Sequence, residues 1–103
     1  VDGVIGGERN GPLTPASKRC GIIVAGFNPC AVDLVCTRLM GFDYNKIKML
    51  NYIVERQELF KTDVSKIRIL TNENYRNLFD KKNKNRYFDF EPPLGWNEFI
   101  EIG

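Results

Sequence analysis

Four polar side chains in the first third of the chain could bind a ligand: Asp2, Glu8, Asn10 and Asp33. Carboxylate and amide oxygens are the donors that a hard cation such as Mg²⁺ prefers. The three carboxylates, Asp2, Glu8 and Asp33, are therefore candidate metal ligands. The alternative is that Asn and Asp side chains on a loop only hydrogen-bond their own turns.

A second chemical feature is the junction at Asn28 and Pro29, which follows an apolar run. Asn28 can cap a helix, and Pro29 suits the first helical position. The unpaired amides that follow, at Cys30 and Ala31, favour an anion such as phosphate. We expect the glycine-rich segment around Gly11 to converge on this helix start, because ligands of open α/β sheets bind beyond the strand ends. The candidate ligand-binding residues are Asp2, Glu8, Asn10, Gly11, Asn28 and Asp33.

Asp33 is the most informative candidate, because it falls at the edge of an apolar stripe on the predicted helix. The stripe consists of Val32, Val35, Cys36, Leu39 and Met40. A half-buried carboxylate needs hydrogen-bond donors, and the backbone of residues 7–12 is the nearest expected supply. We therefore expect Asp33 to lie against residues 7–12 rather than in open solvent, either as a ligand-binding residue or as a structural one.

The apolar pattern predicts an order of strand, helix, helix and strand. The expected elements are a strand at residues 20–27, a helix from Pro29 to the C-cap Gly41, a helix at 44–58 with Asp43 as N-cap, and a strand at 66–71. A strand, two helices and a strand imply a right-handed crossover. The expected fold is an α/β domain, with a small sheet that holds at least one parallel strand pair joined by a two-helix crossover.

The two ends of the chain are expected to be mostly irregular. Residues 1–17 are rich in Gly and Pro and predict a loop, with a short strand closing near Val4 and Ile5, and residues 73–80 predict a short helix. The basic run at 81–86 precedes Tyr87, Phe88 and Phe90. Such a run can stack single-stranded nucleic acid, but we favour a mobile, exposed turn that leads into an edge strand. We expect residues 81–103 to form a tail that packs on the core.

Composition narrows the class of protein. A chain of 103 residues with 43% hydrophobic residues suits one compact domain, here expected to be a fragment of a longer protein. A net charge of +2 predicts no nucleic-acid partner, and the absence of histidine excludes Ser-His-Asp and Cys-His catalysis within these residues. Three cysteines without C-x-x-C spacing predict free thiols in a reducing compartment, hence a cytoplasmic location. No apolar run is long enough to span a membrane, so we expect no membrane association.

Three sequence pieces resemble a known family. They are D-G-V-x-G-G-E-R-N-G-P, then G-I-I-V-A-G-F-N-P-C-A-V-D, then L-M-G-F-D-Y-N-K-I. In this order, over about residues 2–70, they resemble the C-terminal part of domain-of-unknown-function family 362, which is bacterial and archaeal. The matching positions are Asp2, Glu8, Asn10, Gly11, Pro12, Asn28, Pro29 and Asp33, whereas Arg9 replaces a frequent glycine.

The resemblance implies an α/β domain and a redox setting. Longer members of the family often carry a ferredoxin-type iron–sulfur module, but its four-cysteine motif is not in this chain. No cofactor is therefore assigned to these residues. An iron–sulfur cluster is expected only in an upstream module, and a ferredoxin-like module or a redox protein is the expected partner.

Two functions follow, and neither specifies a reaction. The first is the ligand- or metal-binding part of a larger redox-associated protein, with its site at the glycine-rich loop and the helix start at Asn28 and Pro29. The alternative is a non-catalytic interaction or scaffolding domain with the exposed tail as its contact surface. Whether the acidic residues face a shared cavity distinguishes the two.

Overall fold

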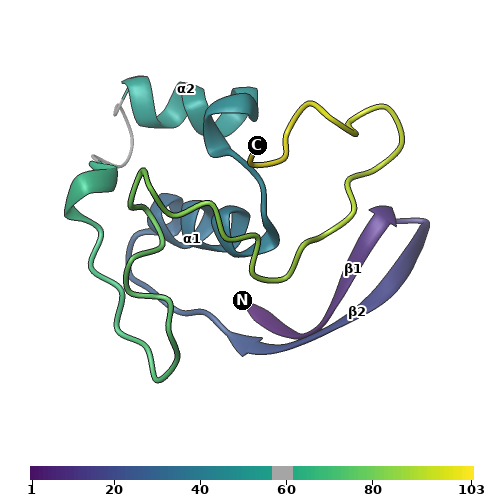
Figure 1. Ribbon diagram of the computed structural model, residues 1–103, viewed down its shortest axis with the longest axis horizontal. Helices are drawn as coiled ribbons and strands as arrows, with labels where there is room; N and C mark the ends of the chain where they lie inside the picture. The colour runs from purple at the N-terminus through teal and green to yellow at the C-terminus, as the bar shows by residue number, and fades with distance from the viewer. Residues whose placement is uncertain (57–61) are drawn as a thin grey trace.

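The computed structural model describes residues 1–56 and 62–103, and its secondary structure is sparse (Figure 1). The elements are β1 (Asp2–Asn10), β2 (Thr14–Ile23), α1 (Pro29–Met40), the 3₁₀ turn η1 (Tyr44–Lys46), α2 (Lys48–Arg56) and the 3₁₀ turn η2 (Val64–Lys66). The strands form a two-stranded antiparallel sheet. The expected parallel strand pair with a two-helix crossover is therefore wrong.

The glycine-rich start of the chain is a long β-hairpin rather than a loop. β1 and β2 pair from Asp2 opposite Ile23 to Asn10 opposite Thr14. Only residues 11–13 connect the strands, so the two halves meet with little loss of chain entropy. The dipeptide Asn10-Gly11 is a hairpin signal that could have predicted this arrangement.

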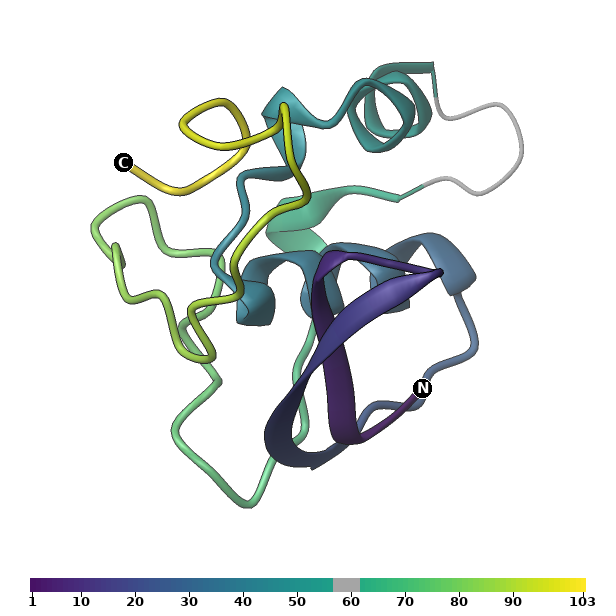
Figure 2. The same cartoon turned by 90° about the vertical axis from the view of Figure 1, so that its right-hand side faces the viewer.

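The boundaries of α1 agree with the capping residues in the sequence. The Ala31 N–H donates to Asn28 Oδ1 at 3.2 Å, which confirms Asn28 as the N-cap, and Pro29 is the first helical residue. Gly41 follows the last turn with φ of 93°, a left-handed conformation that glycine adopts without strain. In two perpendicular views α2 lies above α1, and the hairpin extends from the level of α1 downward (Figures 1 and 2).

The second helix begins later than expected. Asp43 caps η1 rather than a long helix, since Oδ1 accepts the Asn45 N–H at 3.0 Å, and α2 begins at Lys48. The expected end at Glu58 lies outside the described residues. α2 buries Leu50 against Cys30 and Leu34 of α1, as one of the two core clusters.

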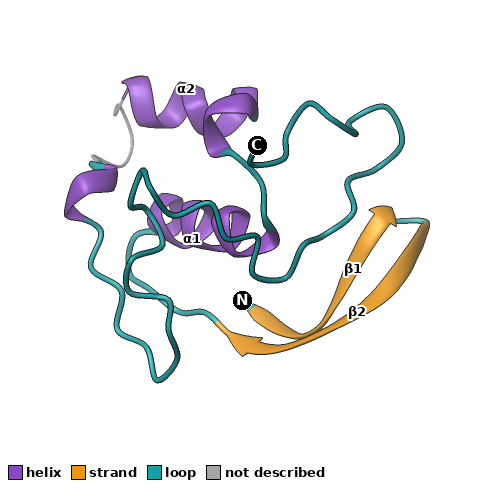
Figure 3. Ribbon diagram, in the orientation of Figure 1, coloured by secondary structure: helices purple, strands orange, loops and turns teal. Residues whose placement is uncertain are grey.

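The C-terminal third contains neither helix nor strand after η2 (Figure 3). The strand expected at 66–71 is wrong: residues 67–71 have no ladder partner. An alternating apolar pattern specifies an extended backbone but does not choose its partner, and β2 pairs instead with its neighbour in sequence. The helix expected at 73–80 and the edge strand expected after residue 86 are also wrong, because both segments consist of turns and irregular chain.

The irregular tail is held by the C-terminal end of α1. The Phe88 N–H donates to Leu39 O at 3.0 Å, and the Phe90 N–H donates to Met40 O at 2.8 Å. These carbonyls have no partner inside the helix, so the tail supplies the missing donors. Phe90 also packs with Phe42 and Ile100 in the second core cluster.

Candidate functional site

The structure does not bring the six predicted site residues to one place. Asp2 lies at the start of β1, where its Oδ1 accepts the Val4 N–H at 3.1 Å. Glu8 and Asn10 lie toward the other end of β1, Gly11 follows in the turn, and Asn28 caps α1. Within residues 1–56 and 62–103 there is no group of three or more Cys, Asp or Glu residues that could hold a metal ion.

Asp33 does not lie where the sequence indicated. Its side chain is exposed on α1, and it lies beside Val1, Val24 and Val32 in a shallow hollow near the helix start. No hydrogen bond joins it to residues 7–12 in the described part of the chain. The expectation was wrong because residues 7–10 belong to β1 and lie next to the turn of the hairpin. The opposite end of the hairpin, at Val1 and Val24, is the end that lies beside Asp33.

Glu8 is instead part of a contact between the hairpin and the tail. Its Oε2 accepts the Lys18 ammonium at 3.0 Å and the Glu91 N–H at 2.9 Å. Lys18 also donates to Asp89 O at 2.7 Å. Burial by itself raises the pKa of Glu8, but the Glu91 N–H and Lys18 outweigh burial and leave this pKa below its ordinary value.

The neighbours of Glu8 extend the same contact. Arg9 forms a bidentate ion pair with Glu91, with Nε 2.7 Å from Oε2 and Nη2 3.1 Å from Oε1. The backbone of Arg9 is left-handed, with φ of 67°. Asn10 Oδ1 accepts the Leu94 N–H at 2.8 Å. A Cβ added at Gly6 would lie 2.8 Å from Phe90 Cζ, so this glycine permits the tail to approach β1. Glu8, Arg9 and Asn10 therefore act here as structural tethers.

The pKa of Glu8 makes stability depend on pH. The folded-state pKa lies below the value of about 4.3 for an unperturbed glutamate. Ionised Glu8 therefore stabilises the fold above the unfolded pKa, and this contribution disappears as the pH falls through the folded pKa. We expect the free energy of unfolding, measured with urea between about pH 7 and pH 3, to fall more steeply for the wild type than for Glu8→Gln. Parallel curves for wild type and Glu8→Gln would contradict the assignment.

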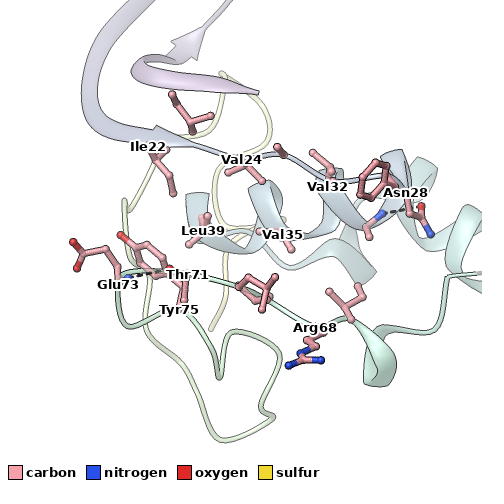
Figure 4. A pocket seen from close by; sticks show the side chains of 18 of the residues that line it. Ile22, Val24, Asn28, Val32, Val35, Leu39, Arg68, Thr71, Glu73 and Tyr75 are labelled. Carbon is pink, nitrogen blue, oxygen red and sulfur yellow. Dashed lines mark hydrogen bonds between the residues drawn. The ribbon is translucent and has the colours of Figure 1, made fainter.

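An open cleft runs along the side of α1 that α2 does not cover, with a volume of about 1350 Å³ (Figure 4). One wall is formed by residues 20–28 and the other by residues 66–73, while Val32, Val35 and Leu39 form the floor. The two walls run in opposite directions, from Ile22 to Asn28 and from Arg68 to Glu73. We call this hollow the α1 cleft.

The α1 cleft exists because α1 is apolar on two opposite faces. Each residue turns an α-helix by about 100°, which places Val32, Val35 and Leu39 on the side opposite Cys30 and Leu34. α2 covers the face of Cys30 and Leu34. Val32 and Val35 remain only half-buried. Val32 and Val35 of the expected stripe thus lie on the side that α2 does not cover, whereas Leu39 is only 3% exposed and Met40 packs against the second core cluster.

Both walls of the α1 cleft expose apolar side chains. Ile23 is 75% exposed, Leu70 is 85% exposed and Phe27 is fully exposed. At one end, Asn28 Nδ2 donates to Thr62 Oγ1 at 3.0 Å. At the other end, burial and the nearby Glu73 carboxylate raise the pKa of Tyr75. Polar groups therefore border the apolar cleft at its ends.

Arg38 is a structural residue that sequence reasoning missed. It is buried on α1, and its guanidinium donates to Asn85 O at 2.7 Å and to Asn83 O at 2.6 Å. Burial lowers the pKa of Arg38, and no carboxylate pairs with it in the described structure. The basic run at 81–86 is therefore anchored to α1 through its main chain, unlike the mobile turn that was expected. An arginine on a largely apolar helix is the signal that could have revealed it.

The three cysteines are free, as the spacing predicted. Cys30 is buried, and Cys20 and Cys36 are half-buried. Burial raises the pKa of the Cys36 thiol, which lowers the fraction of reactive thiolate.

Comparisons with protein-family models, with curated proteins and with solved structures give no match. The resemblance to family 362 therefore stays a prediction. In the described residues no helix is both long and apolar enough to cross a membrane.

Proposed function

We propose that this chain is a protein-interaction domain and that its partner docks in the α1 cleft. The observation that carries the proposal is the second apolar face of α1, which α2 does not cover. An apolar helix face is normally packed against another element of the fold. Large exposed apolar patches in proteins mark sites of interaction.

The size and lining of the α1 cleft favour a polypeptide over a small ligand. Its volume of about 1350 Å³ exceeds the range of about 300–1,000 Å³ that is usual for small-molecule pockets. The floor carries aliphatic side chains, and polar side chains lie at the ends. The exposed Leu94, Trp96 and Phe99 of the tail lie on irregular chain and do not line the α1 cleft.

The other hypothesis, a ligand- or metal-binding part of a redox-associated protein, remains a prediction. We favour an interaction domain because Glu8 and Asn10 already accept main-chain amides of the tail. A ligand at those oxygens would have to displace the tail. Iron–sulfur chemistry, and a ferredoxin-like or redox partner, remain expectations of the family resemblance.

The experiment uses a library of displayed random peptides, selected on the folded chain and counter-selected on Val35→Lys. Val35 faces the α1 cleft and is half-buried, so we expect the lysine side chain to reach water and the free energy of unfolding to change by about 1 kcal/mol or less. Peptides that bind the wild type should lose about tenfold or more in affinity for Val35→Lys.

Glu55→Lys, on the exposed surface of α2, is the matched control and should bind the same peptides as the wild type. If no selected peptide distinguishes the wild type from Val35→Lys, the α1 cleft is not the docking site and the proposed function is wrong.

A further inference from the structure

The two walls of the α1 cleft offer unpaired main-chain groups. Val1 and Val24 exchange both of their main-chain hydrogen bonds, at 2.6 and 3.0 Å, so they form a hydrogen-bonded antiparallel pair. In such a ladder the N–H and C=O of the adjacent Ile23 point to the opposite edge. β1 is the only strand paired with β2 in the described structure, so that opposite edge is open.

The facing wall is extended and equally unpaired. The amides of Arg68, Ile69 and Leu70 make no hydrogen bond within residues 1–56 and 62–103. An unpaired strand edge is a template for another strand. The cleft is therefore bordered on two sides by main-chain donors and acceptors, with apolar side chains beneath them.

The length of the floor defines the length of an occupant. α1 has 12 residues and is about 18 Å long. An extended segment of about five or six residues covers the same length. Such a segment presents every second side chain to Val32, Val35 and Leu39.

The ends of the α1 cleft carry opposite charges. Arg68 and Glu73 lie at the two ends of one wall (Figure 4), and neither side chain has an ion-pair partner in the described residues. Asp63 and Lys66, near the Arg68 end, lie 4.0 Å apart and compensate each other. A complementary occupant is apolar in its centre, with an acidic residue near Arg68 and a basic residue near Glu73.

We propose that the partner inserts a β-strand of about six residues into the α1 cleft, between β2 and residues 67–72, with alternate apolar residues on α1 and opposite charges at its ends. This inference rests on the proposed function and specifies its partner. Because the two walls run in opposite directions, the inserted strand is parallel to one wall and antiparallel to the other. Main-chain hydrogen bonds to both walls provide affinity, and the apolar contacts choose the register.

Two capped peptides test the inference: Lys-(Thr-Val)₃-Asp and Asp-(Thr-Val)₃-Lys. Each peptide places its aspartate near Arg68 in only one of the two possible strand directions. We therefore expect at least one of the two peptides to bind in a calorimetric titration. N-methylation of its central residues, one at a time, should weaken binding by about tenfold at successive positions, since each amide donates to one wall or the other. Arg68→Glu should weaken binding by about threefold or more, and a peptide with lysine at both ends should recover the loss, because both ends of the cleft are then acidic.

Proline variants of the chain test the wall itself. Neighbouring amides of an extended chain point to opposite sides, so either Ile69→Pro or Leu70→Pro removes a donor that faces the cleft. One of the two should weaken peptide binding by about tenfold, with Ile69→Ala and Leu70→Ala as matched controls. Circular dichroism of each variant checks that the fold is kept.

The outcomes separate the two proposals. Binding that Val35→Lys abolishes but N-methylation leaves unchanged overturns strand insertion and leaves the interaction domain standing. If N-methylation weakens binding only at alternate positions of the peptide, the strand pairs with one wall alone. That result overturns insertion between the two walls. Failure of both peptides also overturns strand insertion, whereas the display selection decides the proposed function separately. A concentration-dependent dimer in sedimentation that competes with the peptide identifies a second copy as the occupant and overturns a foreign strand.

Discussion

Leu34→Ala is expected to lower the free energy of unfolding by about 2–5 kcal/mol. Leu34 is 0% exposed and packs with Cys30 and Leu50 between the two helices. Truncation removes its contacts and leaves a cavity, because helices fixed by caps and loops on both sides close only partly around the gap. Urea unfolding followed by circular dichroism measures the loss.

The neighbouring residue is the matched control for this prediction. Val35 lies on the opposite face of α1, over the open cleft, and is only half-buried. Val35→Ala is expected to cost about 1 kcal/mol or less. Equal losses for the two variants would show that both faces of α1 are packed in the free chain, which would contradict the α1 cleft as an uncovered surface.

Arg38→Ala is expected to lower the free energy of unfolding by about 1.5–3 kcal/mol. The change removes two hydrogen bonds, which join the guanidinium to the carbonyls of Asn83 and Asn85, and it removes the contact of Arg38 with the Tyr87 ring at 5.9 Å. The tail then loses an anchor on α1. Hydrogen exchange at the amides of Phe88 and Phe90, which bond the end of the same helix, should become faster.

Two further variants show which property of Arg38 matters. Arg76→Ala removes an exposed arginine that has no ion pair or hydrogen bond in the described residues, and it should change stability by no more than about 0.5 kcal/mol. Arg38→Lys keeps the positive charge but lacks the planar fork that reaches two carbonyls. Full stability of Arg38→Lys would show that charge alone anchors the tail.

The sequence predicted a binding site at Glu8 and Asn10, where the structure has hydrogen bonds between the hairpin and the tail. Glu8 and Asn10 have the side chains of ligand-binding residues, and they accept hydrogen bonds from Glu91 and Leu94. These partners are 83 and 84 residues away in sequence. A carboxylate that binds a cation and one that accepts a hydrogen bond from an amide distant in sequence can have the same neighbouring residues. The sequence pattern alone therefore does not distinguish them.

Local chemistry determined the boundaries of α1 and the buried side of α2. Asn28, Pro29 and Gly41 act within one turn of the chain, through hydrogen bonds and backbone conformation that depend on neighbouring residues. Leu50 and the half-buried Ile53 follow the helical period of α2 for the same reason. Such signals are complete in the sequence because their physical partners lie three or four residues away.

Only the tertiary structure decided how the extended segments pair and which face of α1 is covered. The segments at 20–27 and 66–71 have strand-like patterns, but β2 pairs with β1 while residues 67–71 remain unpaired across the α1 cleft. A period of two residues defines which side chains share a face, and it contains no information on the partner. α1 is apolar on opposite faces, and its sequence does not specify that α2 packs on Cys30 and Leu34 while Val32 and Val35 stay open. Which face of α1 is covered depends on how the segments that follow α1 fold back onto it.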